Sequence, residues 1–215
     1  MNTQDIKALE VADEPFLVAS LIDRCPKTMM IRELLMNALE AAKLAPDGKR
    51  DVEFSSVQMD GTEKLCIWNA GRGMDASELM QICNIASSLN KEMSLTGNFG
   101  MGAKVASLPS NQRGMRYRSC KDGKVHEVIL CKRDGVYGLL RRRMSGSQEY
   151  VEVVDVTDLV ETGGRNVDTD WTEVLLLGNQ PDQNTVKDPY NGDPTQETQW
   201  LATYLTIDFT GCQME

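Results

Sequence analysis

The chain has 215 residues, of which 41% are hydrophobic and 26% charged, the balance of an ordinary globular protein with one sizeable core. No apolar run approaches the roughly 20 residues that cross a bilayer, and the polar N-terminus lacks a signal-peptide segment. These features predict a cytoplasmic protein without a membrane partner. The net charge of −9 argues against direct nucleic-acid binding by the whole molecule. Six scattered cysteines without a Cys-x-x-Cys pair indicate reduced thiols rather than a zinc site or disulfides.

The first part of the chain predicts two helices followed by a hairpin. Apolar residues recur at helical spacing over residues 15–21 and again over about 28–44, where the sequence APDG ends the pattern. Residues 52–59 and 64–68 then read as two strands joined by a turn at Asp60-Gly61.

The rest of the chain predicts two more helices and then a sheet. Asp75 with Glu78 opens a helix to about residue 88, residues 89–98 form a loop, and a further helix runs from about Gly102 to near Pro109. The strands that follow are separated by Asp-Gly turns at 122–123 and 134–135, with later candidates at 148–156 and 172–177. Helices followed by a mostly antiparallel sheet predict an α+β fold, a two-layer α/β sandwich with helices on one face.

The domain organisation predicts one domain over residues 1–178 and a connector over 179–215. The connector is rich in loop residues, and Trp200, Leu201, Tyr204 and Leu205 have helical spacing within it. The abrupt ending at residues 211–215 leads us to expect a fragment that continues into a C-terminal region.

Three polar residues of the second predicted helix share one stripe. Glu33, Asn37 and Glu40 are spaced i, i+4, i+7 within ELLMNALEA. Such a stripe is often only a solvated helix face. The functional alternative is that the carboxylate orients and deprotonates water while the amide oxygen binds Mg²⁺.

Two glycine-rich segments follow, and each alone could be a plain turn. Asn69–Met74 (NAGRGM) comes directly after a strand, and its two glycines allow the backbone to lie flat against a planar ligand. Gly97–Lys104 (GNFGMGAK) precedes a helix N-terminus, where free amides attract phosphate and Lys104 adds a positive charge. The spacing matches neither the Walker motif nor the dinucleotide fingerprint, so a mobile glycine lid is the better interpretation.

In this order and spacing, the three segments resemble the N, G1 and G2 boxes of the GHKL ATPases. That superfamily includes gyrase, the ninety-kilodalton heat-shock chaperone, histidine kinases and the mismatch-repair protein MutL. The resemblance covers about residues 28–177. It implies the Bergerat fold, with ATP and Mg²⁺ bound between the helices and a lid.

The resemblance also implies a role for individual residues. Glu33 would be catalytic and position the attacking water, and Asn37 would ligate Mg²⁺. Asn69 would bind the adenine amino group, and Thr172 would lie near the adenine. The other residues of the implied nucleotide site are Gly71, Gly73 and Met74 at the adenine and Gly97, Gly100, Met101, Gly102, Ala103 and Lys104 around the phosphates.

The sequence departs from the family pattern at two positions. Asn69 stands where the family usually has aspartate, although eukaryotic type II topoisomerases look similar here, and its amide oxygen still accepts a hydrogen bond without charge assistance. Trp171 stands where a glycine usually precedes the threonine.

The resemblance implies Mg²⁺-dependent ATP binding and slow ATP hydrolysis. In the gyrase, MutL and chaperone branches the module drives conformational change or ATP-dependent homodimerisation of a larger protein, and a following domain completes the γ-phosphate site. One alternative is a nucleotide-gated binding module with negligible hydrolysis and an unknown protein partner. The other is the ATPase part of a DNA-handling protein related to topoisomerases or the MORC ATPases.

Two further features bear on these alternatives. The basic residues at 132–133 and 141–143 flank a turn and form either a solvated strand edge or a phosphate-binding patch. His126, the only histidine, lies in the middle of a predicted strand, which argues against the histidine-kinase branch and phosphotransfer to His126.

Overall fold

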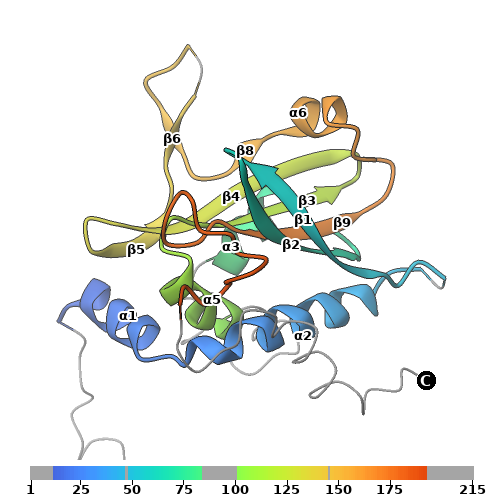
Figure 1. Ribbon diagram of the computed structural model, residues 1–215. Helices are drawn as coiled ribbons and strands as arrows, with labels where there is room; N and C mark the ends of the chain where they lie inside the picture. Colours follow the sequence, from blue (N-terminus) through green and yellow to red (C-terminus); the bar gives the residue numbers. More distant parts are fainter. Residues whose placement is uncertain (1–11, 47, 84–100, 145, 193–215) are drawn as a thin grey trace, which may run out of the picture.

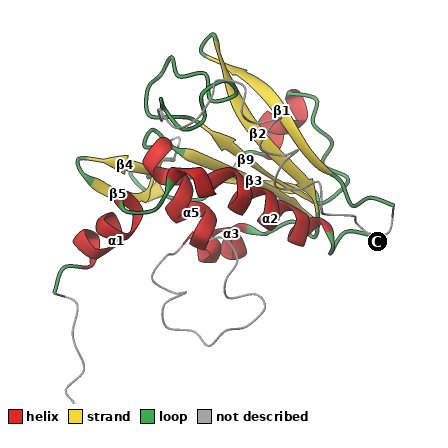
Figure 2. Ribbon diagram, turned by 60° about the horizontal axis from the view of Figure 1, so that its bottom comes forward, coloured by secondary structure: helices red, strands yellow, loops and turns green. Residues whose placement is uncertain are grey.

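The computed structural model describes residues 12–46, 48–83, 101–144 and 146–192 and has an α+β fold. A large antiparallel sheet forms one layer, and most of the helices lie against one of its faces (Figures 1 and 2). The predicted α+β class, with its mostly antiparallel sheet, is therefore confirmed. Among the described residues, no helix is both long enough and apolar enough to span a membrane.

The main sheet has the order β1-β2-β9-β3-β4-β5, and the short β8 pairs with β4. All of these pairings are antiparallel. The strands are β1 (Val52–Met59), β2 (Thr62–Ala70), β3 (Met115–Lys121), β4 (Lys124–Arg133), β5 (Val136–Leu139), β8 (Val154–Asp155) and β9 (Trp171–Leu176). The last of these strands in sequence, β9, therefore lies inside the sheet between β2 and β3.

Three Asp-Gly turns connect neighbouring strands at the predicted places. In the turns at 60–61, 122–123 and 134–135, both the aspartate and the glycine have positive φ, between 50° and 82°. Two consecutive residues with positive φ form the type I′ turn, whose twist matches that of antiparallel strands. These turns fix the β1–β2, β3–β4 and β4–β5 hairpins.

Among the described residues, four helices cover one face of the sheet, which we call the inner face (Figure 2). They are α1 (Glu14–Asp23), α2 (Met30–Ala42), α3 (Ala76–Cys83) and α5 (Met101–Ser107), with 3-10 turns η2 (Lys27–Met29) and η3 (Leu108–Ser110). The predicted capping pair is present, since Glu78 N–H donates to Asp75 at 3.0 Å and Asp75 N–H donates to Glu78 at 3.1 Å. The predicted helices at 15–21 and 28–44 correspond to α1 and α2.

The core lies between these helices and the inner face. Ile31, Leu34 and Ala38 of α2 pack in one cluster with Ile67 of β2 and Val174 of β9. Because side chains alternate along a strand, the neighbouring residues of β2 and β9 point to the opposite, outer face. The sheet thus presents an apolar inner face to the helices.

Within the part of the chain that the structure describes, the outer face carries one short helix and a network of charged side chains. Val160 of α6 (Thr157–Thr162) packs with Cys120, Val125 and Trp171. Glu127 pairs with Arg118 at 2.6 Å and with Arg142, while Glu173 pairs with Arg165 at 3.1 Å. The helix α6 was not predicted from the sequence, and of the helices in the described ranges it is the one that lies on the outer face.

The single strand predicted for residues 148–156 is wrong. The chain instead forms β7 (Tyr150–Val151), which pairs with β6 (Arg142–Arg143), and then β8, which pairs with β4. The chain leaves the two-stranded hairpin for the main sheet between these elements, so one continuous strand cannot form. In Figure 1 the β6–β7 hairpin projects from the sheet.

Residues 179–192, which we call the strap, are loop-like as predicted but pack closely on the domain. Thr185 accepts from Leu65 N–H at 2.8 Å and donates to Leu176 O at 2.9 Å, so it bridges β2 and β9 where their pairing stops. The buried Tyr190 donates its hydroxyl to Thr28 O at 3.2 Å. The predicted loop at 89–98 and the helical spacing at 200–205 lie outside the described residues.

Candidate functional site

A cavity of about 480 Å³ opens between α2 and the inner face of the sheet. Seven of the residues that the sequence analysis assigned to a nucleotide site line it: Asn37, Asn69, Gly71, Gly73, Met74, Lys104 and Thr172. They come from α2, from the end of β2 and the segment after it, from α5 and from β9. The fold thus brings residues of three separate motifs to one cavity, whose volume is typical of a small-molecule site.

The polar floor of the cavity is formed by paired strands. Asn69 of β2 and Thr172 of β9 are direct Cα partners, and Thr172 is also the partner of Ser119 in β3. Asn69 is buried, and its side-chain Nδ2 donates to Ala70 O at 2.9 Å. This bond leaves the Asn69 oxygen as an acceptor, the orientation that the sequence analysis expected for binding an amino group.

The glycines at 71 and 73 are required by close backbone approach. Gly73 has φ of +60°, and a Cβ there would collide with Cys120 O. A Cβ on Gly71 would lie 3.1 Å from Ala41 O and 3.2 Å from Asn69 Nδ2. The next residue, Met74, donates its backbone N–H to Ser119 Oγ at 2.8 Å, which holds the loop against β3.

Lys104 is a buried cation at the cavity wall. Its side chain belongs to a residue that is 2% exposed, and among the described residues no carboxylate lies within ion-pair distance of it. Burial lowers the pKa of Lys104, although the nearby Cys83 thiol opposes the shift. Burial likewise raises the pKa of Cys83, to about 12, so that thiol is neutral at pH 7. An anion bound in the cavity would favour the protonated form of Lys104 and oppose this lowering of its pKa.

Glu33 lies one helical turn before Asn37 on α2 but does not line the cavity. Its carboxylate contacts Gly102 so closely that a Cβ at that position would collide with it. Asn37 does line the cavity, and its amide oxygen is a suitable Mg²⁺ ligand. Within the described part of the chain, no group of three His, Cys, Asp or Glu side chains could hold a metal by itself.

The remaining predicted residues of the phosphate segment are only partly described. Ala103 is buried in the core, and neither it nor Gly102 lines the cavity. Gly97 and Gly100 lie outside the described residues, as does the side chain of Met101. Their implied roles therefore stay predictions.

Trp171, at the position where the resemblance led us to expect a glycine, does not line the cavity. It points to the outer face of β9, where it packs with Cys120 and donates its indole N–H to Asn166 O at 2.9 Å. Thr172, the next residue, therefore points to the opposite face and into the cavity.

Sequence reasoning missed most of the apolar walls of the cavity. Glu40 of the predicted polar stripe also lines the cavity, and the lining residues that were not predicted are Leu34, Ala38, Ala41, Leu44, Ile67, Arg72, Ile82, Tyr117 and Val174. Helical spacing from Asn37 indicates Ala41, and strand alternation from Asn69 and Thr172 indicates Ile67 and Val174. Tyr117, on β3, becomes identifiable only once the pairing of β3 with β9 is known.

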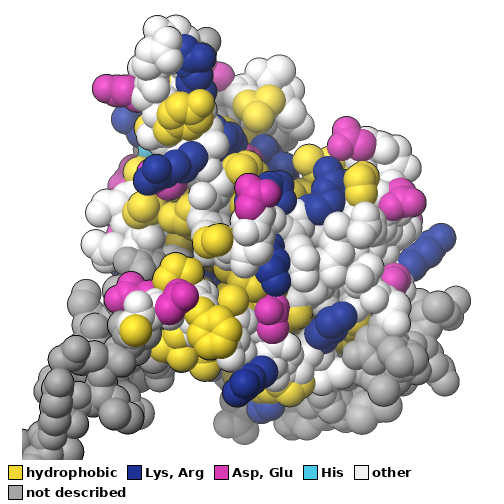
Figure 3. Space-filling view, turned by 90° about the vertical axis from the view of Figure 1, so that its left-hand side faces the viewer, with side chains coloured by type: hydrophobic (Ala, Val, Ile, Leu, Met, Phe, Trp, Pro, Cys, Tyr) yellow, Lys and Arg dark blue, Asp and Glu magenta, His cyan; other side chains and the backbone are white. Residues whose placement is uncertain are grey.

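The basic residues at 132–133 and 141–143 are bound within the protein. Lys132 pairs with Asp23, Arg141 with Glu152 and Arg142 with Glu127. On the face shown in Figure 3, basic side chains are spread among acidic and hydrophobic ones. These intramolecular pairs favour a structural role over a phosphate-binding patch.

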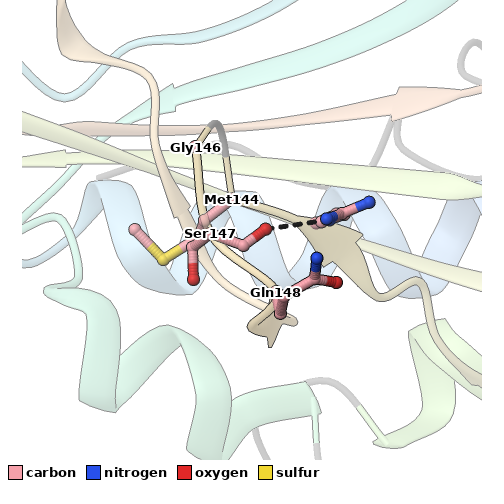
Figure 4. Close-up of a pocket in the computed structure, with 5 residues that line it drawn as sticks. Met144, Gly146, Ser147 and Gln148 are labelled. Carbon is pink, nitrogen blue, oxygen red and sulfur yellow. Dashed lines mark hydrogen bonds between the residues drawn. The ribbon is translucent and has the colours of Figure 1, made fainter.

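A second hollow lies in the β6–β7 hairpin, and none of the predicted nucleotide-site residues lines it. It is lined by Arg143, Met144, Gly146, Ser147 and Gln148, and Arg143 Nε donates to Ser147 O at 2.8 Å (Figure 4). A single turn forms this hollow, and its one charged side chain is already bonded to the backbone. It therefore offers no convergent chemistry for a ligand.

Comparison with known proteins adds no assignment to this geometry. No protein-family model matches the chain, and no curated protein matches its sequence.

Proposed function

We propose that the chain binds an adenine nucleotide together with Mg²⁺ in the cavity between α2 and the sheet, and that it hydrolyses ATP slowly as a GHKL-type module with a Bergerat fold. The nucleotide state would drive conformational change or dimerisation of a larger assembly. One observation carries the proposal: three motifs that are distant in sequence contribute Asn37, Asn69 and Lys104 to the same cavity.

The chemistry of the cavity suits a purine base. Ile67, Met74 and Val174 provide apolar surface for the faces of a flat ring, while Asn69 and Thr172 provide polar atoms for its edge. The glycines of the loop bring the backbone close enough for such contact. An apolar slot with polar groups along one wall binds a heteroaromatic ring better than a sugar or a lipid chain.

Lys104 and Asn37 support the phosphate and metal part of the proposal. A buried ammonium group without a carboxylate partner is costly, and a bound phosphate would offset that cost. Mg²⁺ prefers oxygen ligands and usually shares them between one or two side chains and a substrate phosphate. Asn37 fits this requirement, because its amide is at the cavity wall and makes no hydrogen bond with another described residue.

The position of Glu33 favours a second candidate, a nucleotide-gated binding module with negligible hydrolysis. Its carboxylate rests against Gly102 rather than in the cavity. A general base must come within hydrogen-bond reach of the attacking water. If the protein binds nucleotide with normal affinity, measurable ATP turnover favours the ATPase and its absence favours the binding module.

The decisive experiment is calorimetric titration with ADP and a non-hydrolysable ATP analogue, each with and without Mg²⁺. We expect micromolar binding that Mg²⁺ strengthens. The Asn37→Ala variant should lose the Mg²⁺ dependence, whereas Arg32→Ala, an exposed residue of the same helix, should retain it. Absence of binding for both nucleotides, with and without Mg²⁺, would refute the proposed function.

A further inference from the structure

Ser119 is a fully buried serine of β3 that lies behind the floor of the cavity and does not line it. Three groups surround its hydroxyl. Met74 N–H donates to Ser119 Oγ at 2.8 Å, Trp171 O lies at 3.1 Å, and Thr172 Oγ1 lies at 2.8 Å. Ser119 thus connects the loop that follows β2 to the threonine at the cavity floor.

The number of available protons determines which group donates each hydrogen bond in this cluster. The amide of Met74 can only donate and the carbonyl of Trp171 can only accept, while each hydroxyl has one proton and two lone pairs. If Ser119 donates to Trp171 O, then Thr172 donates to Ser119 and three hydrogen bonds form. If Ser119 donates to Thr172 instead, its contact with the Trp171 carbonyl is lost and only two form. The first arrangement is favoured because it forms one more hydrogen bond than the second.

In the favoured arrangement, Thr172 presents lone pairs to the cavity. Asn69 does the same, because its Nδ2 is engaged with Ala70 O at 2.9 Å and its oxygen is left free. The two residues are direct partners across β2 and β9, so their acceptors lie side by side. A ligand edge that meets both must therefore donate hydrogen bonds.

We propose that Ser119 is a positioning residue that fixes this acceptor polarity and so selects a base with an amino group over one with a carbonyl group at the same edge. The inference rests on the proposed function, because it concerns the base of the nucleotide. The 6-amino group of adenine donates to Thr172 and Asn69. The 6-carbonyl of hypoxanthine or guanine would place its lone pairs against theirs.

The test is the ratio of the affinities for ADP and IDP, which differ in the base at its 6-position and at N1. The wild-type protein should bind ADP more tightly than IDP by about 30-fold or more, the discrimination expected when polar groups of the site would be left unpaired. In Ser119→Ala, the Thr172 proton is released and can turn toward the ligand. That variant should bind ADP more weakly and IDP more tightly, so that the ratio falls by about tenfold or more.

Matched variants separate this role from a general structural one. Ser56→Ala removes an exposed hydroxyl of β1 and should keep the wild-type ratio. Thr172→Ser keeps the hydroxyl and should also keep it, whereas Thr172→Val should lower it. If Ser119→Ala fails to fold by circular dichroism, Ser119→Cys, with a similar shape but a poor donor and acceptor, should lower the ratio in the same direction.

The outcomes distinguish the two proposals. A wild-type protein that binds neither nucleotide refutes the proposed function and this inference with it. Equal binding of ADP and IDP by the wild-type protein leaves nucleotide binding established and overturns the inference. An equal loss of both affinities in the Ser119 variants also overturns it, because a structural defect does not change the ratio.

Discussion

Replacing Lys104 by methionine should make the free protein more stable and weaken nucleotide binding at the same time. Lys104 is 2% exposed, and no carboxylate of the described residues pairs with it. Methionine fills a similar volume without a charge, so the variant avoids the cost of burying an unpartnered ammonium group. The same change removes the positive charge that would contact phosphate.

The magnitudes follow from the burial and from the missing carboxylate partner. Placing an ammonium group in a buried position without a carboxylate costs about 1–3 kcal/mol, which for a chain of this size corresponds to a rise in melting temperature of about 2–12 °C in Lys104→Met. A hydrogen bond to a charged group contributes about 1.5–3 kcal/mol, so the affinity for ADP should fall by about 10- to 150-fold. Stability and ligand binding therefore change in opposite directions.

Lys64 provides the matched control, because it is equally buried but fully engaged. It is also 2% exposed, yet its Nζ donates to Pro181 O at 3.0 Å and to Gln183 O at 2.6 Å. Lys64→Met leaves these two carbonyls of the strap without a donor and should destabilise the protein by about 3 kcal/mol. Because Lys64 does not line the cavity, the affinity of the folded variant for ADP should be unchanged.

The assay combines thermal unfolding without ligand with calorimetric titration of ADP. A pH series adds a third readout. Burial lowers the pKa of Lys104, and a bound phosphate would raise it again, so binding takes up a proton and the affinity should fall as the pH rises toward the ordinary lysine pKa of about 10.4. Lys104→Met should lack this dependence. If Lys104→Met loses stability as Lys64→Met does, or binds ADP as tightly as the wild type, Lys104 is not an uncompensated cation that contacts the nucleotide.

Three further changes test other parts of the structure. Gly73→Ala places a Cβ against Cys120 O at positive φ and should lower the free energy of unfolding in urea by more than about 2 kcal/mol. Gly61→Ala, in an open turn, should lower it by only about 1 kcal/mol. Equal losses would contradict the contact assigned to Gly73. Glu33→Gln should keep nucleotide binding and abolish turnover, and surviving turnover in a phosphate-release assay would exclude Glu33 as the base. Burial raises the pKa of Glu127, but the surrounding guanidinium groups, led by that of Arg118, outweigh burial and lower it, so the carboxylate stabilises the fold above about pH 4.5 and this contribution is lost as the pH falls. Glu127→Gln should cost about 3 kcal/mol at pH 7 and weaken the dependence of stability on pH in acid. An unchanged loss of stability in acid would argue against the pairing.

The local elements of the fold could be predicted because their signals are local. The Asp-Gly turns at 60–61, 122–123 and 134–135 require two consecutive positive φ angles, which this dipeptide adopts readily. The capping pair of Asp75 and Glu78 is likewise contained within four residues. These turns and the start of α3 therefore lie where they were predicted.

Pairings between distant segments could not be predicted in the same way. Residues 148–156 have the composition of one strand, but β7 and β8 pair with different partners, so the break between them is set by tertiary structure. The helix α6 is six residues long, too short for a helical period to be evident.

The residues of the candidate site could be predicted where they belong to a recognisable sequence motif. Asn37, Asn69 and Lys104 belong to such motifs and line the cavity. Ser119 has no local signal, because its importance arises from the register of β3 with β9. Trp171 is the opposite case. It departs from the family pattern in the sequence, but it does not affect the cavity because its side chain points to the outer face.

The position of β9 has a consequence for how the protein is made. The hairpin β1–β2 and the strands β3–β5 can each form soon after synthesis, but β9 joins them, and its pairing of Leu175 with Cys66 spans more than one hundred residues. Long-range pairing is slow and leaves strand edges exposed until it occurs. Until the ribosome has released residues 171–176, the nascent chain therefore holds two separate parts of the sheet. Each part has an unpaired strand edge that can form non-native strand pairs. Because Thr172 arrives with β9, closure of the sheet and completion of the cavity are a single late event in folding.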